Sequence, residues 1–342
     1  MPVGSVLRSF TNFVSYFDTR TRNPQWVIEK ISEDTSYGDG NRKFSYFKED
    51  ASIPEKLRNK LEDFRGSGYD RGHMAPASAH KLSQKTMDET FTLSNISPQV
   101  GAGFNRDYWA RFESYVKGLC KEYEEVLVVT GPLFLPRPKS NDTGAAEEWE
   151  MRYNLLGQAP DLMAVPTHFF KVVLTTKPKS GGKKSHAVGS FVMPNAYIPP
   201  EVPLTSFVVP LDSLERATGT IFFPKLISSG GGSRANVFDN YVYDFDKAAV
   251  KWQGKGVRDV KELESVSEMA GSSGGDGALV VASETLSHKD NLAVAPSSSS
   301  GSRSHNHVAV KEKPKPPVRV KHVQHLCDAT ACELPKENFW KR

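Results

Sequence analysis

Short apolar runs separated by turn residues recur through residues 24–227, and they constrain the fold more than any other feature of the chain. Runs such as VLVVTGPLF at 126–134 and HFFKVVLTT at 168–176 have the length and the β-branched content of buried strands. Only one long stretch has helical periodicity. Many strands with few helices are typical of an α+β domain built around a central, mostly antiparallel sheet.

The one clear helical pattern runs from about Asn105 to Glu124. Apolar side chains recur there at steps of three and four residues, which makes one stripe that can face a core. Asn105 stands at the expected start, where an asparagine side chain commonly caps the first turn. The stripe consists of Trp109, Phe112, Val116, Leu119, Cys120 and Tyr123.

Composition divides the chain into four parts. We expect residues 1–23 to be an N-terminal extension and residues 24–227 to be the globular domain. Residues 228–317 are rich in Gly, Ser, Pro and Lys, so this insertion buries little apolar surface and is predicted to be largely disordered. Residues 318–342 contain HVQHLCDATACEL, which is expected to return to the domain and can supply its last strand.

Charge and cysteine content exclude few classes of function. A net charge of +4 does not by itself indicate nucleic-acid binding. No apolar run approaches the roughly 20 residues of a membrane span, and the N-terminus lacks the features of a secretory signal peptide. Three cysteines, Cys120, Cys327 and Cys332, do not suggest a domain built on disulfides.

The segment GYDRGHMAPA at 68–77 carries the most specific chemistry. Hydrolysis of a phosphodiester needs an activated water and stabilisation of the charge that develops at phosphorus. His73 can take a proton from water because an imidazole titrates near working pH, and Arg71 can clamp phosphate oxygens. A spacing of two residues in a strand places both side chains on one face. Gly72 between them allows a phosphate or a backbone to approach closely.

A divalent cation would complete such a site. Asn105 offers a hard amide oxygen that suits Mg²⁺, and Mg²⁺ keeps most of its waters, so one or two protein ligands suffice. The positive end of the helix also favours phosphate binding there. Glu113 lies two turns, or about 12 Å, along an ideal helix, so we expect a link to the metal only through water.

Taken together, these segments resemble the DNA/RNA non-specific endonucleases, which have a ββα-metal core. The similarity is greatest to the mitochondrial, endonuclease G-like branch, particularly its fungal-type members. It covers residues 23–227 and resumes at LCDATACEL. The segments that carry it are NPQWVIEKIS at 23–32, FKEDASIP at 47–54, SGYDRGHMAPA at 67–77, TFTLSNISPQVGAGFNRDYWARFE at 90–113, VVTGPL at 128–133 and VPTHFFKVVL at 165–174.

The resemblance implies an endonuclease that hydrolyses double- and single-stranded DNA and RNA with little sequence preference and leaves 5′-phosphate ends. It implies His73 as the general base and Asn105 as the ligand of a single hydrated Mg²⁺ or Mn²⁺. Arg71 would bind the phosphate, and Glu113 would hold a metal-bound water. The resemblance further implies a homodimer in mitochondria, although no clear leader peptide is seen.

Three supporting residues are also assigned by resemblance. Asn95 would orient the site, and Asp70 would buttress the strand that carries the histidine. Arg42 is the candidate for a second phosphate-binding arginine upstream of the motif. The alternative function is a catalytically inactive nucleic-acid-binding or interaction protein on the same scaffold, and the complete set of catalytic side chains argues against it.

Two further motifs in the chain are ambiguous. The tripeptide at 305–307 spells HNH, but the HNH nuclease signature consists of three separated positions. A second set combines the ligand types of a zinc site, yet its spacing HxxHxC(x4)C is not that of a common zinc knuckle. A disulfide or two buried thiols therefore compete with zinc there. That set consists of His322, His325, Cys327 and Cys332.

Overall fold

The structure is a computed structural model of the chain, and it describes residues 4–138, 148–178, 186–224 and 323–335. The predicted insertion at 228–317, with its HNH tripeptide, lies outside the described residues, as does His322. No helix in the described part of the chain is both long and apolar enough to cross a lipid bilayer.

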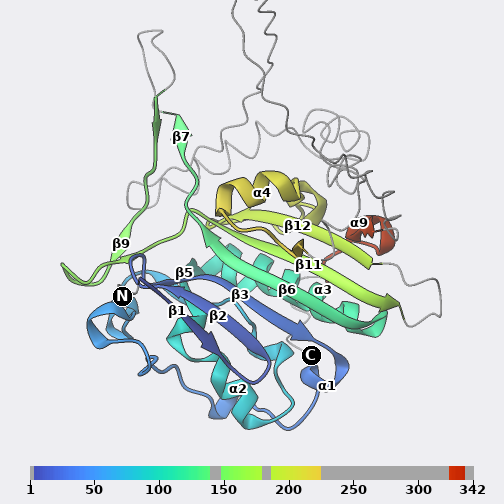
Figure 1. Cartoon of the computed structure of the whole chain (residues 1–342), viewed down its shortest axis with the longest axis horizontal. Coiled ribbons are helices and arrows are strands. Elements are labelled where there is room, and N and C mark those ends of the chain that lie inside the picture. Colours follow the sequence, from blue (N-terminus) through green and yellow to red (C-terminus); the bar gives the residue numbers. More distant parts are fainter. Residues whose placement is uncertain (1–3, 139–147, 179–185, 225–322, 336–342) are drawn as a thin grey trace, which may run out of the picture.

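A seven-stranded sheet forms the centre of the molecule (Figure 1), in the order β1-β2-β3-β6-β11-β12-β13. The first six strands pair antiparallel, and the short last strand runs parallel to β12. The predicted α+β class with a mostly antiparallel sheet is therefore confirmed. The strands are β1 (Ser5–Ser9), β2 (Phe13–Asp18), β3 (Asn23–Ile31), β6 (Tyr123–Leu133), β11 (His168–Pro178), β12 (His186–Pro194) and β13 (Val323–His325).

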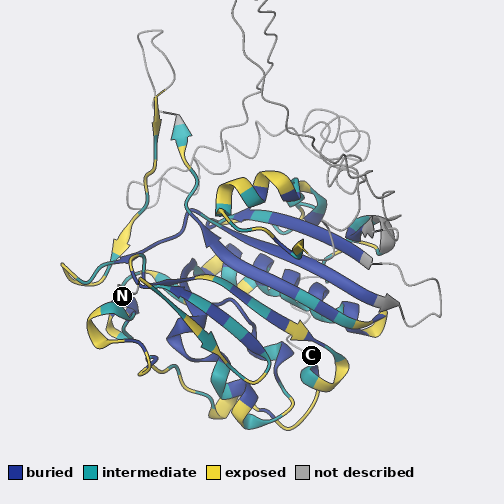
Figure 2. Ribbon diagram, viewed as in Figure 1, coloured by how far each residue is buried: buried dark blue, intermediate teal, exposed yellow. Residues whose placement is uncertain are grey.

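Helices cover both faces of this sheet. α3 (Trp109–Gly118) packs on one face and α4 (Leu211–Thr218) on the other (Figure 1). Successive residues of β6 alternate between the two cores, with Val128 on the α3 side and Val129 on the α4 side. Because both faces are covered, the central strands read as continuous apolar runs rather than alternating ones, and Figure 2 shows them buried along most of their length.

A second, two-stranded sheet lies on the α3 side and carries the DRGH motif. β4 (Tyr69–His73) pairs antiparallel with β5 (Ile96–Val100), so that His73 lies opposite Ile96. The chain then passes through the helical segment η6 (Gly101–Tyr108) into α3. Met74 and Phe104 join the core under α3, which fixes this strand–strand–helix unit to the central sheet.

The helix differs from its prediction at both ends. Ala102 and Gly103 have non-helical dihedral angles, with φ of +77° at Gly103, so Asn105 lies in the first turn after a break and is not an N-cap. Tyr197 packs against Gly103 where a side chain would otherwise lie, and this contact places the break. At the other end, Gly118 closes α3, and a single 3₁₀ turn leads into β6.

Short 3₁₀ turns precede both strands of the motif sheet. η2 (Glu55–Leu57) and η3 (Glu62–Phe64) come before β4, and η5 (Leu93–Asn95) comes directly before β5. The remaining elements are α1 (Glu33–Ser36), η1 (Arg42–Phe44), η4 (Ala77–Ala79), α2 (Gln84–Thr90), η7 (Leu119–Lys121), β7 (Arg137–Pro138), β8 (Trp149–Glu150), β9 (Leu155–Leu156), β10 (Met163–Ala164), η8 (Leu204–Phe207) and α9 (Leu326–Ala329).

Residues 1–23 are not an extension in the part that the structure describes. β1 and β2 form a hairpin that adds two strands to the sheet through the pairing of β2 with β3. Phe13, Ser15 and Phe17 are buried on one face, and the intervening residues are partly exposed. This alternation is the pattern of a strand with one covered face, and it explains why the segment belongs to the domain.

The C-terminal segment packs against α3. Leu326 of α9 is fully buried in the core beneath that helix, and the Tyr115 hydroxyl lies 2.9 Å from Thr330 Oγ1. Cys327 and Cys332 form a disulfide with Cα atoms 5.1 Å apart. Of the alternatives left open by the sequence, the structure therefore has the disulfide, and neither sulfur is available as a zinc ligand.

The place of β2 in the core is testable with Phe17→Ala. Phe17 is 0% exposed, so we expect its truncation to lower the free energy of unfolding by about 3–5 kcal/mol in urea titrations. As the control, Leu7→Ala on β1 changes a side chain that is 58% exposed, and should change stability by no more than about 0.5 kcal/mol. Equal, small effects of both variants would contradict the fold described for residues 5–18.

Candidate nuclease site

His73 ends β4 with its ring buried between aromatic side chains. It is 7% exposed, and its ring centroid lies 4.8 Å from that of Phe91, edge to face, and 5.4 Å from that of Phe47. Its Nε2 atom is buried and has no hydrogen-bond partner among the described residues. Burial, with smaller contributions from Arg42 and His80, lowers the pKa of His73 to about 3. The imidazole is therefore neutral at physiological pH, which is the state that accepts a proton.

The position of His73 depends on Asn95, which is fully buried. The Asn95 Oδ1 atom accepts a hydrogen bond from the Ala75 amide at 2.9 Å, and its Nδ2 atom donates to the Ala75 carbonyl at 3.0 Å and the Thr90 carbonyl at 2.8 Å. The Met74 amide donates to the Asn95 carbonyl at 2.9 Å. The backbone directly after His73 is thus held on both sides by one residue, so Asn95 acts on the site through the backbone.

Two arginines lie against the aromatic side chains that pack on His73. Arg71, exposed on β4, places Cζ 4.7 Å from the ring centroid of Phe47. Arg42, exposed at the start of η1, places Cζ 5.4 Å from the ring centroid of Phe91. Because Phe47 contacts both Arg71 and His73, the two motif side chains lie on one face of β4, as the spacing predicts. The result is two cationic groups beside a neutral imidazole.

Asn105 is hydrogen-bonded to Asp70, which lies on the face of β4 opposite to Arg71 and His73. Its Nδ2 atom donates to Asp70 Oδ2 at 2.9 Å, and Arg106 donates to both oxygens of the same carboxylate at 2.5 and 2.7 Å. The Arg106 guanidinium holds the pKa of Asp70 below its usual range. Since a carboxylate only accepts hydrogen bonds, the amide nitrogen of Asn105 must face it. The amide oxygen then remains as the acceptor for another ligand.

Glu113 is half-buried on α3 and lies near a buried lysine. Burial raises the pKa of Glu113 to about 7, although the positive charge of Lys171 opposes this shift. Lys171 is 1% exposed, donates from Nζ to Thr130 Oγ1 at 2.8 Å and lies 4.7 Å from the ring centroid of Trp109. Lys171 was not among the residues predicted from the sequence, although it is the only charged residue in the apolar run 168–176.

Gln99 is a second residue that the sequence analysis missed. It is 0% exposed on β5 and packs against Gly72, where any side chain would collide with it. Neither polar atom of its side-chain amide has a hydrogen-bond partner among the described residues. A buried amide without partners is costly, so Gln99 is available to hydrogen-bond a water or a ligand at the motif. In the sequence, Gln99 is recognisable as the polar residue that ends the segment SNISPQ at 94–99.

The available donors fit a hydrated Mg²⁺ better than a metal held by a full protein cage. In the described ranges no group of three or more His, Cys, Asp or Glu residues could hold a metal ion. The amide oxygen of Asn105 is a hard ligand, and Mg²⁺ commonly binds through one or two such ligands while keeping its waters. The residues present therefore suffice for this cation.

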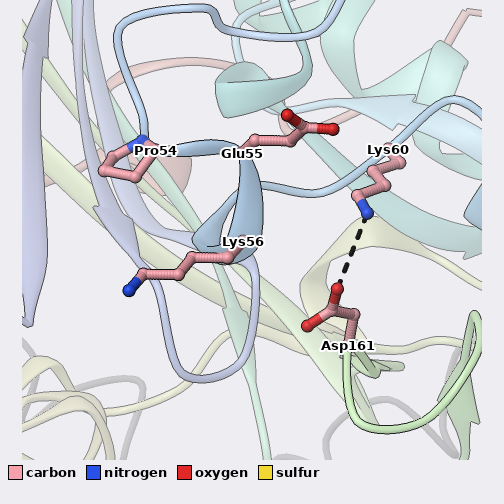
Figure 3. A pocket seen from close by; sticks show the side chains of 5 residues that line it. All are labelled: Pro54, Glu55, Lys56, Lys60 and Asp161. Carbon is pink, nitrogen blue, oxygen red and sulfur yellow. Dashed lines mark ion pairs between the residues drawn. The ribbon is translucent and has the colours of Figure 1, made fainter.

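One surface hollow lies away from these residues. It measures about 460 Å³ and is lined by Pro54, Glu55, Lys56, Lys60 and Asp161 (Figure 3). The ion pair between Lys60 Nζ and Asp161 Oδ2, at 3.6 Å, spans it. None of the seven residues to which the sequence assigns a site role lines this hollow.

The raised pKa of Glu113 predicts how the stability of the folded protein depends on pH. The folded chain binds this proton more tightly than the unfolded chain, whose glutamate has the ordinary pKa of 4.5. The stability that this group contributes is fully present below pH 4.5 and is lost as the pH rises through 7. In urea titrations with a chelator present, we expect the wild type to lose stability across this range relative to Glu113→Gln. Parallel pH dependences of the two proteins would contradict the shift.

Comparison with known proteins adds independent evidence. A mitochondrial nuclease of Saccharomyces cerevisiae is 44% identical over 74% of this chain and 76% of its own length. Nuclease 1, mitochondrial, of Schizosaccharomyces pombe is 48% identical over 60% of this chain and 62% of its own, and human endonuclease G, mitochondrial, is 40% identical over 69% and 75%.

The fold comparison points the same way. A chain in a crystal structure of an EndoG/EndoGI complex matches with a TM-score of 0.60 and 40% identity, covering 65% of this chain and 87% of that one. The sequence profile of the DNA/RNA non-specific endonucleases matches residues 1–228. The resemblance stated from the sequence is thereby confirmed, and the chain belongs to the DNA/RNA non-specific endonuclease family.

Proposed function

We propose that this nuclease hydrolyses phosphodiesters with His73 as the general base and Asn105 as the protein ligand of one hydrated divalent cation. The observation that carries the proposal is the buried, neutral His73 ring with an unpartnered Nε2 atom beside two exposed arginines. Support for the metal role comes from Asn105, because Asp70 fixes its amide nitrogen and leaves the oxygen available.

In the proposed reaction, the imidazole of His73 removes a proton from a water molecule, and the resulting hydroxide attacks phosphorus. The bond from phosphorus to the 3′-oxygen breaks, and that oxygen takes a proton from water, which leaves a 3′-hydroxyl and a 5′-phosphate. Arg71 and Arg42 bind the non-bridging oxygens. The phosphate charge beside the ring raises the pKa of His73 toward working pH, so the ring becomes a better base when substrate binds.

A bound Mg²⁺ or Mn²⁺ supplies the positive charge that stabilises the phosphorane-like state and the leaving oxygen. Asn105 would hold this cation, and Glu113 would orient one of its waters. Asn95 keeps the His73 backbone in place, which preserves the alignment of the base. The family is typically metal-dependent, and Mg²⁺ is the ion favoured by a single hard amide ligand.

Weak sequence preference follows from the types of contact. Arginines that bind phosphate carry no direct information about the bases, so DNA and RNA, single- and double-stranded, are substrates in the proposal. We extend the proposal to a homodimer, which rests on the family resemblance alone. A mitochondrial location is supported by several relatives that are named as mitochondrial nucleases.

The rival function is a nucleic-acid-binding or interaction protein without activity. The presence of the base, the amide ligand and both arginines argues against it, because a protein that only binds needs no buried imidazole with an unpartnered nitrogen. Nicking of a plasmid with Mg²⁺ present, and its loss with chelator, distinguishes the two functions.

Replacement of His73 by alanine tests the proposed base. We expect His73→Ala to lose at least about a hundredfold in the rate of plasmid nicking, with an unchanged circular dichroism spectrum. As the control, Arg216→Ala removes a cation that is 80% exposed on α4, on the opposite face of the sheet, and should keep wild-type activity. Activity of His73→Ala within tenfold of the wild type would rule out the proposed role.

A further inference from the structure

Two large aromatic side chains are exposed on the segment that leads into the site. Phe44 is 65% and Tyr46 is 78% exposed. Tyr46 directly precedes Phe47 in the chain, and the ring centroid of Phe47 lies 5.4 Å from that of His73. An exposed aromatic side chain does not gain the free energy that burial would give it. Two exposed aromatic side chains on a segment that contacts the proposed base therefore indicate a surface that binds a partner.

The backbone beneath these aromatics is firmly held. The Gln84 side chain on α2 accepts from the Asn41 amide at 2.9 Å and donates to Ser45 Oγ at 3.0 Å, and Ser45 Oγ donates to Asp88 Oδ1 at 2.6 Å. Beyond the aromatics, the Lys48 amide donates to the Phe91 carbonyl at 3.1 Å. The exposed rings are therefore presented by a fixed support, which lowers the entropic cost of binding to them.

Cations flank the aromatics on both sides along this segment. Arg42, Lys43 and Lys48 are exposed, and none of them forms an ion pair with any described residue. Residues 41–48, NRKFSYFK, contain no acidic residue. Unpaired cations on both sides of two exposed rings match the backbone charge and the flat base faces of single-stranded nucleic acid.

We propose that Phe44 and Tyr46 form a stacking platform for unpaired nucleobases of the strand being cut. Bases in a duplex are already stacked on their neighbours, whereas bases in a single strand offer their faces to a protein. The platform would therefore favour single-stranded DNA and RNA over duplex, through contacts that do not read sequence. This inference deepens the proposed function, because it rests on the placement of the reaction at His73.

The test measures binding without cleavage. Fluorescence anisotropy with a chelator present gives Kd for three labelled probes of equal length: a single-stranded oligonucleotide, its duplex, and an abasic oligonucleotide with the same backbone charge. The variants are Phe44→Ala/Tyr46→Ala and the conservative Phe44→Tyr/Tyr46→Phe. The matched control is Trp149→Ala, which removes an aromatic side chain that is 58% exposed on the projecting strand β8.

We expect the double alanine variant to bind the single strand at least about tenfold more weakly, since loss of one base stack costs roughly five- to hundredfold. Its affinity for the duplex and the abasic probe should equal that of the wild type. The conservative variant and Trp149→Ala should keep wild-type affinity for all three probes.

Unchanged single-strand affinity of the double alanine variant would overturn the platform. An equal loss on all three probes would also overturn it, since that result indicates a contact with the backbone. The proposed base is tested separately, by plasmid nicking of His73→Ala with Mg²⁺ present. Activity of that variant would show that the proposed base is wrong while the binding result stands, so the two failures are distinguishable.

Discussion

The pairing of β4 with β5, closed by the side chain of Asn95, is the interaction on which the site depends. Asn95 uses both polar atoms of its buried amide to bind the backbone of Ala75, directly beyond His73. At the other end of the same strand, Asp70 binds Asn105 and so joins β4 to the helix that follows β5. The proposed base and the proposed metal ligand are thus attached to one short strand from its two ends.

At this strand, burial and the charge of a bound phosphate have opposite effects on the protonation of His73. His73 is kept neutral because its ring lies among Phe47 and Phe91, away from water. The exposed arginines beside it attract phosphate, whose charge would offset both the burial and their own repulsion of a protonated ring. A second charge effect concerns Glu113. The buried ammonium of Lys171 favours the ionised form of that carboxyl group. In the proposed mechanism, this arrangement would favour proton transfer to His73 when a phosphate is bound.

Sequence patterns predicted the parts of the molecule that local physics determines. β6 and β11 were recognisable as unbroken apolar runs, and Arg71 and His73 share a face because strand geometry requires it. The hairpin at residues 5–18 was missed, since its alternation is short and its buried positions include a serine. The helix break at Gly103 depends on Tyr197, and the charge of Lys171 matters only beside Glu113. Such long-range contacts are not encoded in any local window.

The most direct test of the account is a crystal structure of the protein with Mg²⁺ and an uncleavable phosphorothioate oligonucleotide. We expect the Asn105 amide oxygen to bind the ion at about 2.1 Å, with water filling most of the other positions. The His73 ring should lie within hydrogen-bond reach, about 2.6–3.2 Å, of a water aligned for attack on phosphorus. A metal bound away from Asn105, or an oligonucleotide whose phosphate does not approach His73, would contradict the central claim.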